Sequence, residues 1–233
     1  MSNIITVSGL TKKFDKTLAL DNLDFSIDSG RIVGLMGPNG AGKTTLIKTI
    51  MQLYYPDQGN ISVCGKPNHY SSKRLLSYMP DTNPLFNWMS IRDAIQYYTD
   101  FYADFDPVYA KELCGILNLN EKEKVKTLSK GTIERVLVML TFARKARLYL
   151  LDEPISGIDP LGREKIIKTI LAGVNEESSV LISTHLVKDV ETMVDDVLFI
   201  NKGRLLFSDS ADHIRETRGQ SIEECYLEVF KNA

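Results

Sequence analysis

The chain has 233 residues, of which 43% are hydrophobic and 25% charged, so it is long enough for one large domain or for one domain with an inserted subdomain. Its formal net charge of −2 gives no electrostatic reason to expect nucleic acid as a ligand. No apolar run approaches the roughly 18 residues that cross a bilayer, and the first residues lack the layout of a secretory signal, so a membrane role would require a partner chain.

Two strands are expected at the start of the chain. Ile4, Ile5 and Val7 begin a short strand, and residues 23–27 alternate between apolar and polar, as in a half-buried antiparallel strand. Phe14 lies between these strands and is flanked by lysines. Its ring could stack on an adenine or simply plug the small sheet, and the sequence favours neither role.

A buried strand, a glycine-rich turn and a helix N-terminus follow one another from residue 32 to residue 50. The turn consists of Gly37, Pro38, Asn39, Gly40, Ala41, Gly42, Lys43, Thr44 and Thr45. Glycines let backbone amides converge on one point, and the helix dipole adds positive charge there, so such a turn binds polyphosphate oxygens. Lys43 would reach the β- and γ-phosphates, and the Thr44 hydroxyl would hold Mg²⁺. The sequence therefore predicts a nucleotide site.

From Asp81 to about Lys126 the chain is rich in aromatic residues. Helical spacing at 93–101 and at 108–117 predicts an inserted helical subdomain. The aromatic side chains form either a small core, which is the default, or a protein-binding face.

The second half of the chain supplies candidates for chemistry. The apolar run 148–151 predicts a central parallel strand, and Asp152 and Glu153 follow at its carboxyl end, where open α/β sheets place their ligands. Asp152 would hold Mg²⁺ through water, and Glu153 would polarise a water that attacks the γ-phosphate. A solvated strand terminus is the alternative, which the phosphate-binding turn in the same chain disfavours.

Another buried strand, at 180–183, ends next to His185, which we expect at the same edge of the sheet and within reach of the γ-phosphate. Apolar residues from 197 to 207 flank a hairpin signal. Ser221 and Glu224 form a capping box that opens a last helix, whose apolar stripe we expect to pack on the domain.

Taken in order, these segments resemble the nucleotide-binding subunit of an ATP-binding-cassette (ABC) transporter, over nearly the whole chain. Residues 37–45 match the Walker A loop of that family, and 148–153 match its Walker B strand, which ends on the catalytic glutamate Glu153. His185 falls where the switch histidine belongs. Two shorter motifs look like the signature, at Leu128, Ser129, Lys130, Gly131 and Thr132, and the D-loop, at Ser156, Gly157, Ile158 and Asp159.

The resemblance implies an α/β fold: a P-loop NTPase ABC-type cassette with a mixed central sheet, a small antiparallel β subdomain and an inserted α-helical subdomain. Residues 1–233 would form a single ATP-binding domain. Within it, about 1–80 and 136–233 would form a RecA-like core with the antiparallel β subdomain, and about 81–135 a helical subdomain that carries the signature motif.

The family mechanism is a further implication. Two subunits face each other head to tail, with ATP held between the Walker A loop of one and the signature of the other. Ser129 and the amide of Gly131 would donate to the γ-phosphate at the N-terminus of a helix expected from Thr132 to Arg144. Asp159 would contact the opposite subunit, cap the helix that follows Pro160, or do both.

The sequence departs from the family pattern at two positions. Lys130 replaces a glycine of the signature and adds positive charge near the nucleotide. Asp81 replaces the glutamine of the Q-loop, so it can approach Mg²⁺ through water but cannot donate a hydrogen bond. With the segment 101–106, these features look like bacterial ABC-2-type exporters of antimicrobial or amphipathic peptides, in which the aromatic insert would receive the membrane subunit.

The resemblance implies ATP and Mg²⁺ as cofactors, and as partners an integral membrane permease subunit and a second nucleotide-binding subunit. The protein would act at the cytoplasmic face of the cell membrane. Cys64, Cys114 and Cys225 are isolated, so no metal other than Mg²⁺ is expected. One alternative is a non-transport ABC ATPase of translation or assembly, although this chain has a single cassette and no charged linker. Another is a catalytically weak partner in a heterodimer, against which Glu153 and His185 argue.

Overall fold

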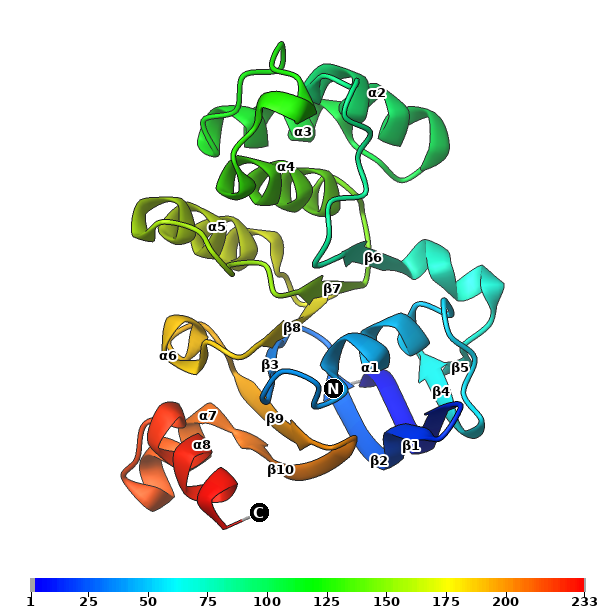
Figure 1. Ribbon diagram of the computed structural model, residues 1–233, viewed down its shortest axis with the longest axis vertical. Coiled ribbons are helices and arrows are strands. Elements are labelled where there is room, and N and C mark those ends of the chain that lie inside the picture. Colours follow the sequence, from blue (N-terminus) through cyan, green and yellow to red (C-terminus); the bar gives the residue numbers. More distant parts are fainter. Residues whose placement is uncertain (1–2, 233) are drawn as a thin grey trace.

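The computed structural model describes residues 3–232, which form a four-stranded antiparallel sheet, a six-stranded sheet and a set of helices (Figure 1). The strands are β1 (Asn3–Phe14), β2 (Thr17–Asp28), β3 (Ile32–Met36), β4 (Gln58–Val63), β5 (Lys66–Pro67), β6 (Leu76–Met79), β7 (Leu148–Asp152), β8 (Ser179–Thr184), β9 (Asp196–Asn201) and β10 (Arg204–Ser210). The α-helices are α1 (Lys43–Ile50), α2 (Ile91–Phe101), α3 (Pro107–Ile116), α4 (Lys130–Phe142), α5 (Pro160–Gly173), α6 (Val187–Val190), α7 (Ala211–His213) and α8 (Ile222–Lys231). Short 3₁₀ segments cover Tyr70–Leu75 and Val125–Thr127, and a π-helical turn covers Ile214–Arg218.

The six-stranded sheet has the order β10-β9-β3-β8-β7-β6. Its neighbouring strands are parallel except for the β9–β10 hairpin, so the mixed central sheet that we expected is confirmed. The carboxyl ends of β3, β7 and β8 meet at one edge, since these strands are parallel neighbours in register. That edge collects the glycine-rich turn, the paired carboxylates and the histidine.

The sheet is buried on both faces, and its strand side chains alternate between two cores. In β7, Leu148 and Leu150 pack with α1 and the antiparallel sheet, whereas Tyr149 and Leu151 pack with α4 and α5. This period of two is the pattern of a strand covered on both sides. Figure 1 shows the two layers on either side of the sheet.

The antiparallel sheet has the order β2-β1-β4-β5. The first strand was expected to be short, but β1 has 12 residues. It pairs with β2 along one side and with β4 along the other, and register shifts between Val7 and Leu10 bend it without ending it. The extra length comes from pairing on both edges, which the local sequence pattern does not reveal.

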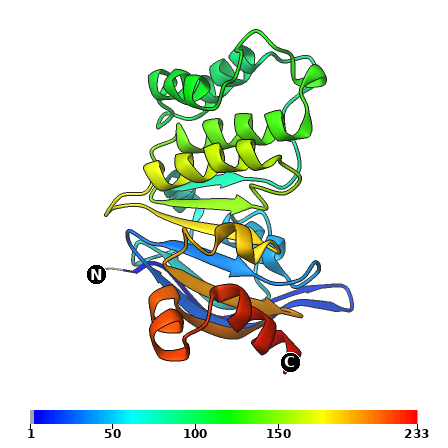
Figure 2. The ribbon, with the colours of Figure 1, turned by 90° about the vertical axis from the view of Figure 1, so that its left-hand side faces the viewer.

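Helices α2 and α3 pack on α4 and form a layer at one end of the molecule (Figures 1 and 2). Ser90 and Asp93 cap α2 reciprocally, and Asp106 caps α3 just before Pro107. Helix α4 runs through residue 135, where we placed a subdomain boundary, so this division of the chain stays a prediction.

The last helix packs as its apolar stripe predicts. Ser221 and Glu224 form the expected capping box. Tyr226 lies against Phe199 of β9, with ring centroids 5.3 Å apart, and Phe230 lies 6.4 Å from the same ring. Among residues 3–232, no helix combines the length and the apolar composition needed to cross a bilayer.

Candidate functional site

The turn between β3 and α1 has a backbone that only glycine permits at two positions. A Cβ atom on Gly37 would overlap the carbonyl oxygen of Ile200. Gly42 is the N-cap of α1 and has a φ of 108°, and a Cβ there would lie 2.7 Å from the carbonyl oxygen of Ala19. The turn therefore folds tightly onto the sheet and presents the open N-terminus of α1, as an anion site requires.

Lys43 is 6% exposed and reaches back into the turn. Its ammonium group donates to the carbonyl oxygens of Gly37, at 2.7 Å, and Pro38, at 3.2 Å, and lies 3.6 Å from a carboxylate oxygen of Glu153. Burial lowers the pKa of Lys43, and the charge of Glu153 opposes that shift. The cation is held inside the turn, where the phosphates of a nucleotide would lie.

Asp152 is completely buried, and its two oxygens have different surroundings. Oδ1 accepts hydrogen bonds from the hydroxyls of Thr44, at 3.1 Å, and Ser183, at 2.5 Å. Oδ2 has no hydrogen-bond partner among the described residues, and burial raises the pKa of the group. A free carboxylate oxygen next to a threonine hydroxyl is a donor set that suits Mg²⁺, so these residues fit the ion that the turn implies. Ser183 was not predicted, because its role depends on how β7 and β8 align.

Glu153 has an unusual backbone, with a φ of 53° in the left-handed region. Its amide donates to the carbonyl oxygen and to the hydroxyl of Ser183, at 3.0 and 3.2 Å. Both of its carboxylate oxygens lie 3.0 Å from Nδ1 of His185. The strained residue is thus fixed by β8, and its carboxylate is oriented by the histidine that we expected at this edge.

A cavity of about 290 Å³ lies beside the turn. Its lining includes Asn39 to Thr45, Asp81, Glu153 and Lys202, the last of which was not predicted. Asp81 also borders a second cavity, of about 230 Å³, that reaches Asp152. A role for Asp81 at Mg²⁺ stays a prediction.

Phe14, a candidate for stacking on adenine, is the last residue of β1 and is 39% exposed. Its ring packs edge-on against Tyr54, with centroids 5.0 Å apart, and the ammonium nitrogen of Lys12 lies 5.3 Å from its centroid. The residues that line the cavity beside the turn include its neighbours Thr17 and Leu18 but not Phe14. Adenine stacking by this ring stays a prediction.

The signature segment forms the start of α4, which spans Lys130–Phe142 and not Thr132–Arg144 as expected. The helix begins earlier because the Ser129 side chain accepts a hydrogen bond from the amide of Thr132, at 3.2 Å, and so caps it. The two residues after Ser129 therefore lie in the first turn of α4. Leu128 is half-buried just before the cap, and Ser129 is exposed.

Arg135 supports this helix start and was not predicted from the sequence. Its guanidinium donates to the Thr132 hydroxyl, at 3.1 Å, to the carbonyl oxygen of Gly131, at 3.3 Å, and to that of Leu117, at 2.9 Å. Three acceptors from two helices fix the signature segment against α3. An arginine on a helix is ordinary in sequence, and nothing in the neighbouring residues indicates such a role.

The D-loop begins three residues after Glu153, and the Ser156 amide donates to the Glu153 carbonyl oxygen at 3.2 Å. Gly157 has a φ of 76°. Asp159 caps α5 by accepting from the amide of Gly162 at 3.0 Å, and this bond lowers its pKa. The expected cap is confirmed, and a contact of Asp159 with another subunit stays a prediction.

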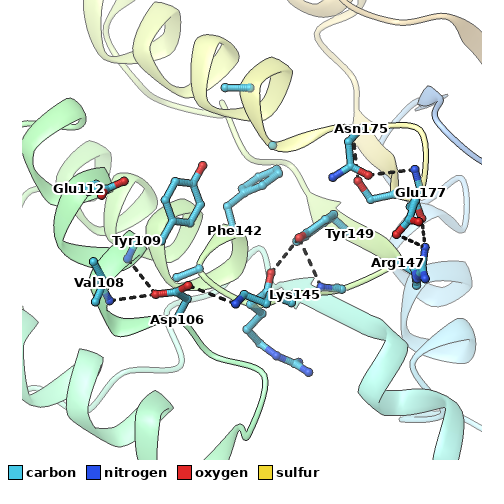
Figure 3. Close-up of a pocket in the computed structure, with 16 residues that line it drawn as sticks. Asp106, Val108, Tyr109, Glu112, Phe142, Lys145, Arg147, Tyr149, Asn175 and Glu177 are labelled. Atoms are coloured by element: carbon cyan, nitrogen blue, oxygen red, sulfur yellow. Dashed lines mark hydrogen bonds and ion pairs between the residues drawn. The ribbon is translucent and has the colours of Figure 1, made fainter.

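A larger cavity, of about 700 Å³, lies between the ends of α4 and α5 and the starts of α3 and β7 (Figure 3). Two ion pairs lie in its lining: Lys145 lies 3.3 Å from Asp106, and Arg147 lies 2.8 Å from Glu177. None of the predicted site residues lines it. It lies at the amino end of β7, away from the carboxylates, and so is separate from the candidate site.

The sequence profile of the family described as "ABC transporter" matches residues 20–156, more than half of the chain. The ABC transporter ATP-binding protein YtrB of Bacillus subtilis is 32% identical over 216 residues, which cover 91% of this chain and 74% of that protein. The lantibiotic transport ATP-binding protein SrtF of Streptococcus pyogenes is 27% identical, over 94% of this chain and 97% of that protein.

A solved structure gives the same result for the fold. The structure of an ATP-binding subunit of an ABC transporter superposes with a TM-score of 0.87 at 26% identity and covers 97% of this chain and 99% of that one. The cassette architecture expected from the motifs is therefore confirmed.

Proposed function

This chain belongs to the ABC transporter family and is one of its ATP-binding, ATP-hydrolysing subunits, and we propose that it is the motor of an exporter, two copies of which clasp two ATP–Mg²⁺ to drive a separate membrane permease. The observation that carries the proposal is the arrangement at the edge of the six-stranded sheet. There Lys43, Thr44 and Asp152 surround the mouth of the turn, and Glu153 is held by His185.

Each of these side chains has a distinct task in hydrolysis. Lys43 and the amides of the turn would bind the phosphate oxygens, and Thr44 and Asp152 would hold Mg²⁺. When bound, the ion would supply positive charge that offsets the charge of the phosphate groups. Glu153 accepts a proton from the attacking water, and His185 keeps its carboxylate in position.

One subunit alone leaves the signature motif without a nucleotide. The lining of the cavity beside the turn includes no signature residue, and Ser129 is exposed at the N-terminus of α4. The N-terminus of a helix, where the first amides have no acceptor within the helix, can bind an anion. In a head-to-tail dimer, the γ-phosphate of the ATP bound to the second copy would be that anion. This arrangement supports a dimer in which Ser129, Gly131 and the D-loop complete the partner's site.

The helical layer supports an interaction with a membrane subunit at the cytoplasmic face. Phe86 and Trp88 are 55% and 65% exposed and stack with centroids 5.9 Å apart. Phe101, 69% exposed, adds a third large apolar side chain in the predicted subdomain 81–135. Exposed aromatic residues of this kind are typical of protein-binding faces. The resemblance to SrtF, named for lantibiotic transport, favours an amphipathic peptide as cargo.

The experiment compares the wild type with Glu153→Gln for ATP hydrolysis and for mass in solution, with and without ATP–Mg²⁺. The wild type should hydrolyse ATP, and the variant should bind ATP, hydrolyse it at least about 100-fold more slowly, and dimerise only when ATP is present. Glu164→Gln, on an exposed part of α5, is the control and should behave like the wild type. Unchanged hydrolysis in Glu153→Gln, or no ATP-dependent dimer, would contradict the proposal.

A further inference from the structure

Lys130, the residue that departs from the family signature, touches two other parts of its own subunit. Its ammonium nitrogen lies 3.8 Å from Oε1 of Glu134, one turn further along α4. The same side chain lies against the D-loop, where a Cβ atom built on Gly157 would be 3.0 Å from that nitrogen. The head of Lys130 therefore pairs with Glu134 on its own helix and lies close to the backbone of the D-loop at Gly157.

Glu134 makes this contact unusual. The residue is 6% exposed, and its Oε2 atom is buried without a hydrogen-bond partner among residues 3–232. Burial raises the pKa of Glu134 to about 7, and the charge of Lys130 partly offsets the shift. Among residues 3–232, Lys130 is the single ionic partner of Glu134. The charge of the carboxylate attracts this lysine, because little else compensates for the hydration that the carboxylate loses on burial.

Glu134 also borders the same cavity as the catalytic residues. The cavity of about 230 Å³ is lined by Asp81, Lys130, Glu134, Asp152 and Glu153, among others. A movement of Lys130 would therefore change the lining of a cavity that Asp152 and Glu153 also border.

We propose that Lys130 and Glu134 form a latch that ties the signature helix to the D-loop in the free subunit, and that the γ-phosphate on the partner copy opens it by competing with Glu134 for the Lys130 ammonium. The inference rests on the proposed head-to-tail dimer. Lys130 lies next to Ser129 at the start of α4 and is 66% exposed at its side chain, so it can turn outward toward such a ligand. A phosphate carries more negative charge than a carboxyl group that is partly protonated near neutral pH, so the exchange favours the nucleotide.

Opening the latch has two consequences within the subunit. The D-loop loses its contact with Lys130 and becomes free to follow the partner, while Glu134 loses its counter-ion. ATP binding would thus be coupled to release of the D-loop through Lys130. The glycine of the usual signature has no side chain and could not provide this coupling. Glu134 acts here as a positioning residue, since it reaches the nucleotide only through Lys130.

The first test needs no dimer. Hydrogen exchange of the amides at 156–159 is measured in the nucleotide-free subunit for the wild type, Lys130→Gln and Glu134→Gln. Both variants should exchange faster than the wild type by about two- to fivefold, the range expected for losing a partly exposed ion pair. Glu164→Gln removes another lysine–glutamate pair of this spacing, with Lys168 on α5, and should leave these amides unchanged. If the amides at 156–159 exchange at the wild-type rate in both Lys130→Gln and Glu134→Gln, the proposal is overturned.

The second test is a double-mutant cycle in the Glu153→Gln background, with ATP-dependent dimerisation as the readout. Glu134→Gln should tighten the dimer by about two- to fivefold, because Lys130 no longer has a competing partner. Lys130→Gln should weaken it, and the double variant should match Lys130→Gln alone. A Glu134→Gln effect that persists without Lys130, or none at all, would overturn the latch. If Glu153→Gln forms no ATP-dependent dimer, the proposed function fails instead, and the exchange experiment still decides the contact.

Discussion

Asp152 and Glu153 are adjacent carboxylates to which we assign different tasks, because their surroundings differ. Asp152 ends β7 with its side chain buried between the Thr44 and Ser183 hydroxyls. The next residue turns out of the strand through a left-handed backbone, which points Glu153 toward Lys43 and His185. A backbone strained in this way is kept where the surrounding structure fixes it, and the hydrogen bonds that the Glu153 amide donates to Ser183 do so here.

A test at this scale is His185→Ala. Without its histidine partner, Glu153 is free to turn toward Lys43, so turnover should fall by about 100-fold or more while ATP affinity stays within about twofold. Steady-state hydrolysis and equilibrium ATP binding measure the two effects. His213→Ala is a matched control, since His213 also pairs with a carboxylate, Asp209, at 2.7 Å but on an exposed turn. Wild-type turnover in His185→Ala would contradict the positioning role.

Glu134 gives a prediction about pH. Its pKa is raised from 4.5 to about 7 in the folded subunit, so between these values the unfolded chain loses a proton that the folded protein keeps. The stabilisation that this group contributes is therefore complete below about pH 4.5 and is lost as the pH rises to about 7. Denaturant unfolding across this range should show the free energy of unfolding of the wild type falling relative to that of Glu134→Gln. Parallel curves for the two proteins would contradict the raised pKa.

The sequence predicted most of the candidate site at residue scale, since the turn, the carboxylate pair and His185 lie in recognisable patterns, and the chemical roles of these residues stay predictions. It did not identify Ser183, Arg135 or Glu134. Their roles arise from contacts across strands or between helices, and a serine in a strand or a charged residue on a helix is ordinary in itself. The left-handed backbone conformation of Glu153 could not be predicted from the sequence either, because glutamate has no preference for it.

At the scale of elements, one arginine joins the helical layer to the central sheet. Arg144, just after α4, is 7% exposed and donates to both oxygens of Asp104, at 3.0 to 3.3 Å, and to the carbonyl oxygen of Leu76 in β6, at 3.0 Å. Its guanidinium also lies 4.1 Å from the centroid of the Tyr102 ring. The segment 101–106, which we singled out by resemblance, thus serves to fasten α2 and α3 to the end of the signature helix.

Arg144→Ala should therefore lower the free energy of unfolding by about 3 kcal/mol, because it leaves Asp104 and a buried carbonyl group without their partner. Arg147→Ala is the matched control. Arg147 forms an ion pair of 2.8 Å with Glu177, but the two side chains are 44% and 75% exposed, so its loss should cost less than about 1 kcal/mol. Equal effects of the two substitutions, measured by chemical denaturation, would contradict the fastening role.

The sequence predicted which segments form helices and strands better than it predicted the residues at which they begin and end. Periodicity located the buried strands, α2, α3 and α8. The start of α4 was misplaced because Ser129 had been assigned to a ligand and not to a cap. The length of β1 depends on pairing with β2 and β4. Both differences come from contacts that a local pattern does not contain.

In the whole molecule, the candidate nucleotide site and the signature segment lie on different elements. Parallel pairing brings the turn, Asp152, Glu153 and His185 to one edge of the sheet, while α4 carries the signature in the adjoining layer. A nucleotide bound at the turn would therefore leave the signature free for a partner. The order of motifs made this architecture predictable from the sequence, whereas the Lys130 contact between α4 and the D-loop required the structure.

We propose that ATP hydrolysis at Glu153 drives a membrane partner. The most direct test is co-purification from membranes of the source cell, comparing the wild type with Glu153→Gln in the presence of ATP–Mg²⁺. The account predicts that Glu153→Gln retains ATP, loses most hydrolysis, and recovers a polytopic membrane protein in stoichiometric amount. Recovery of ribosomes or soluble assembly factors, with no membrane protein, would contradict it.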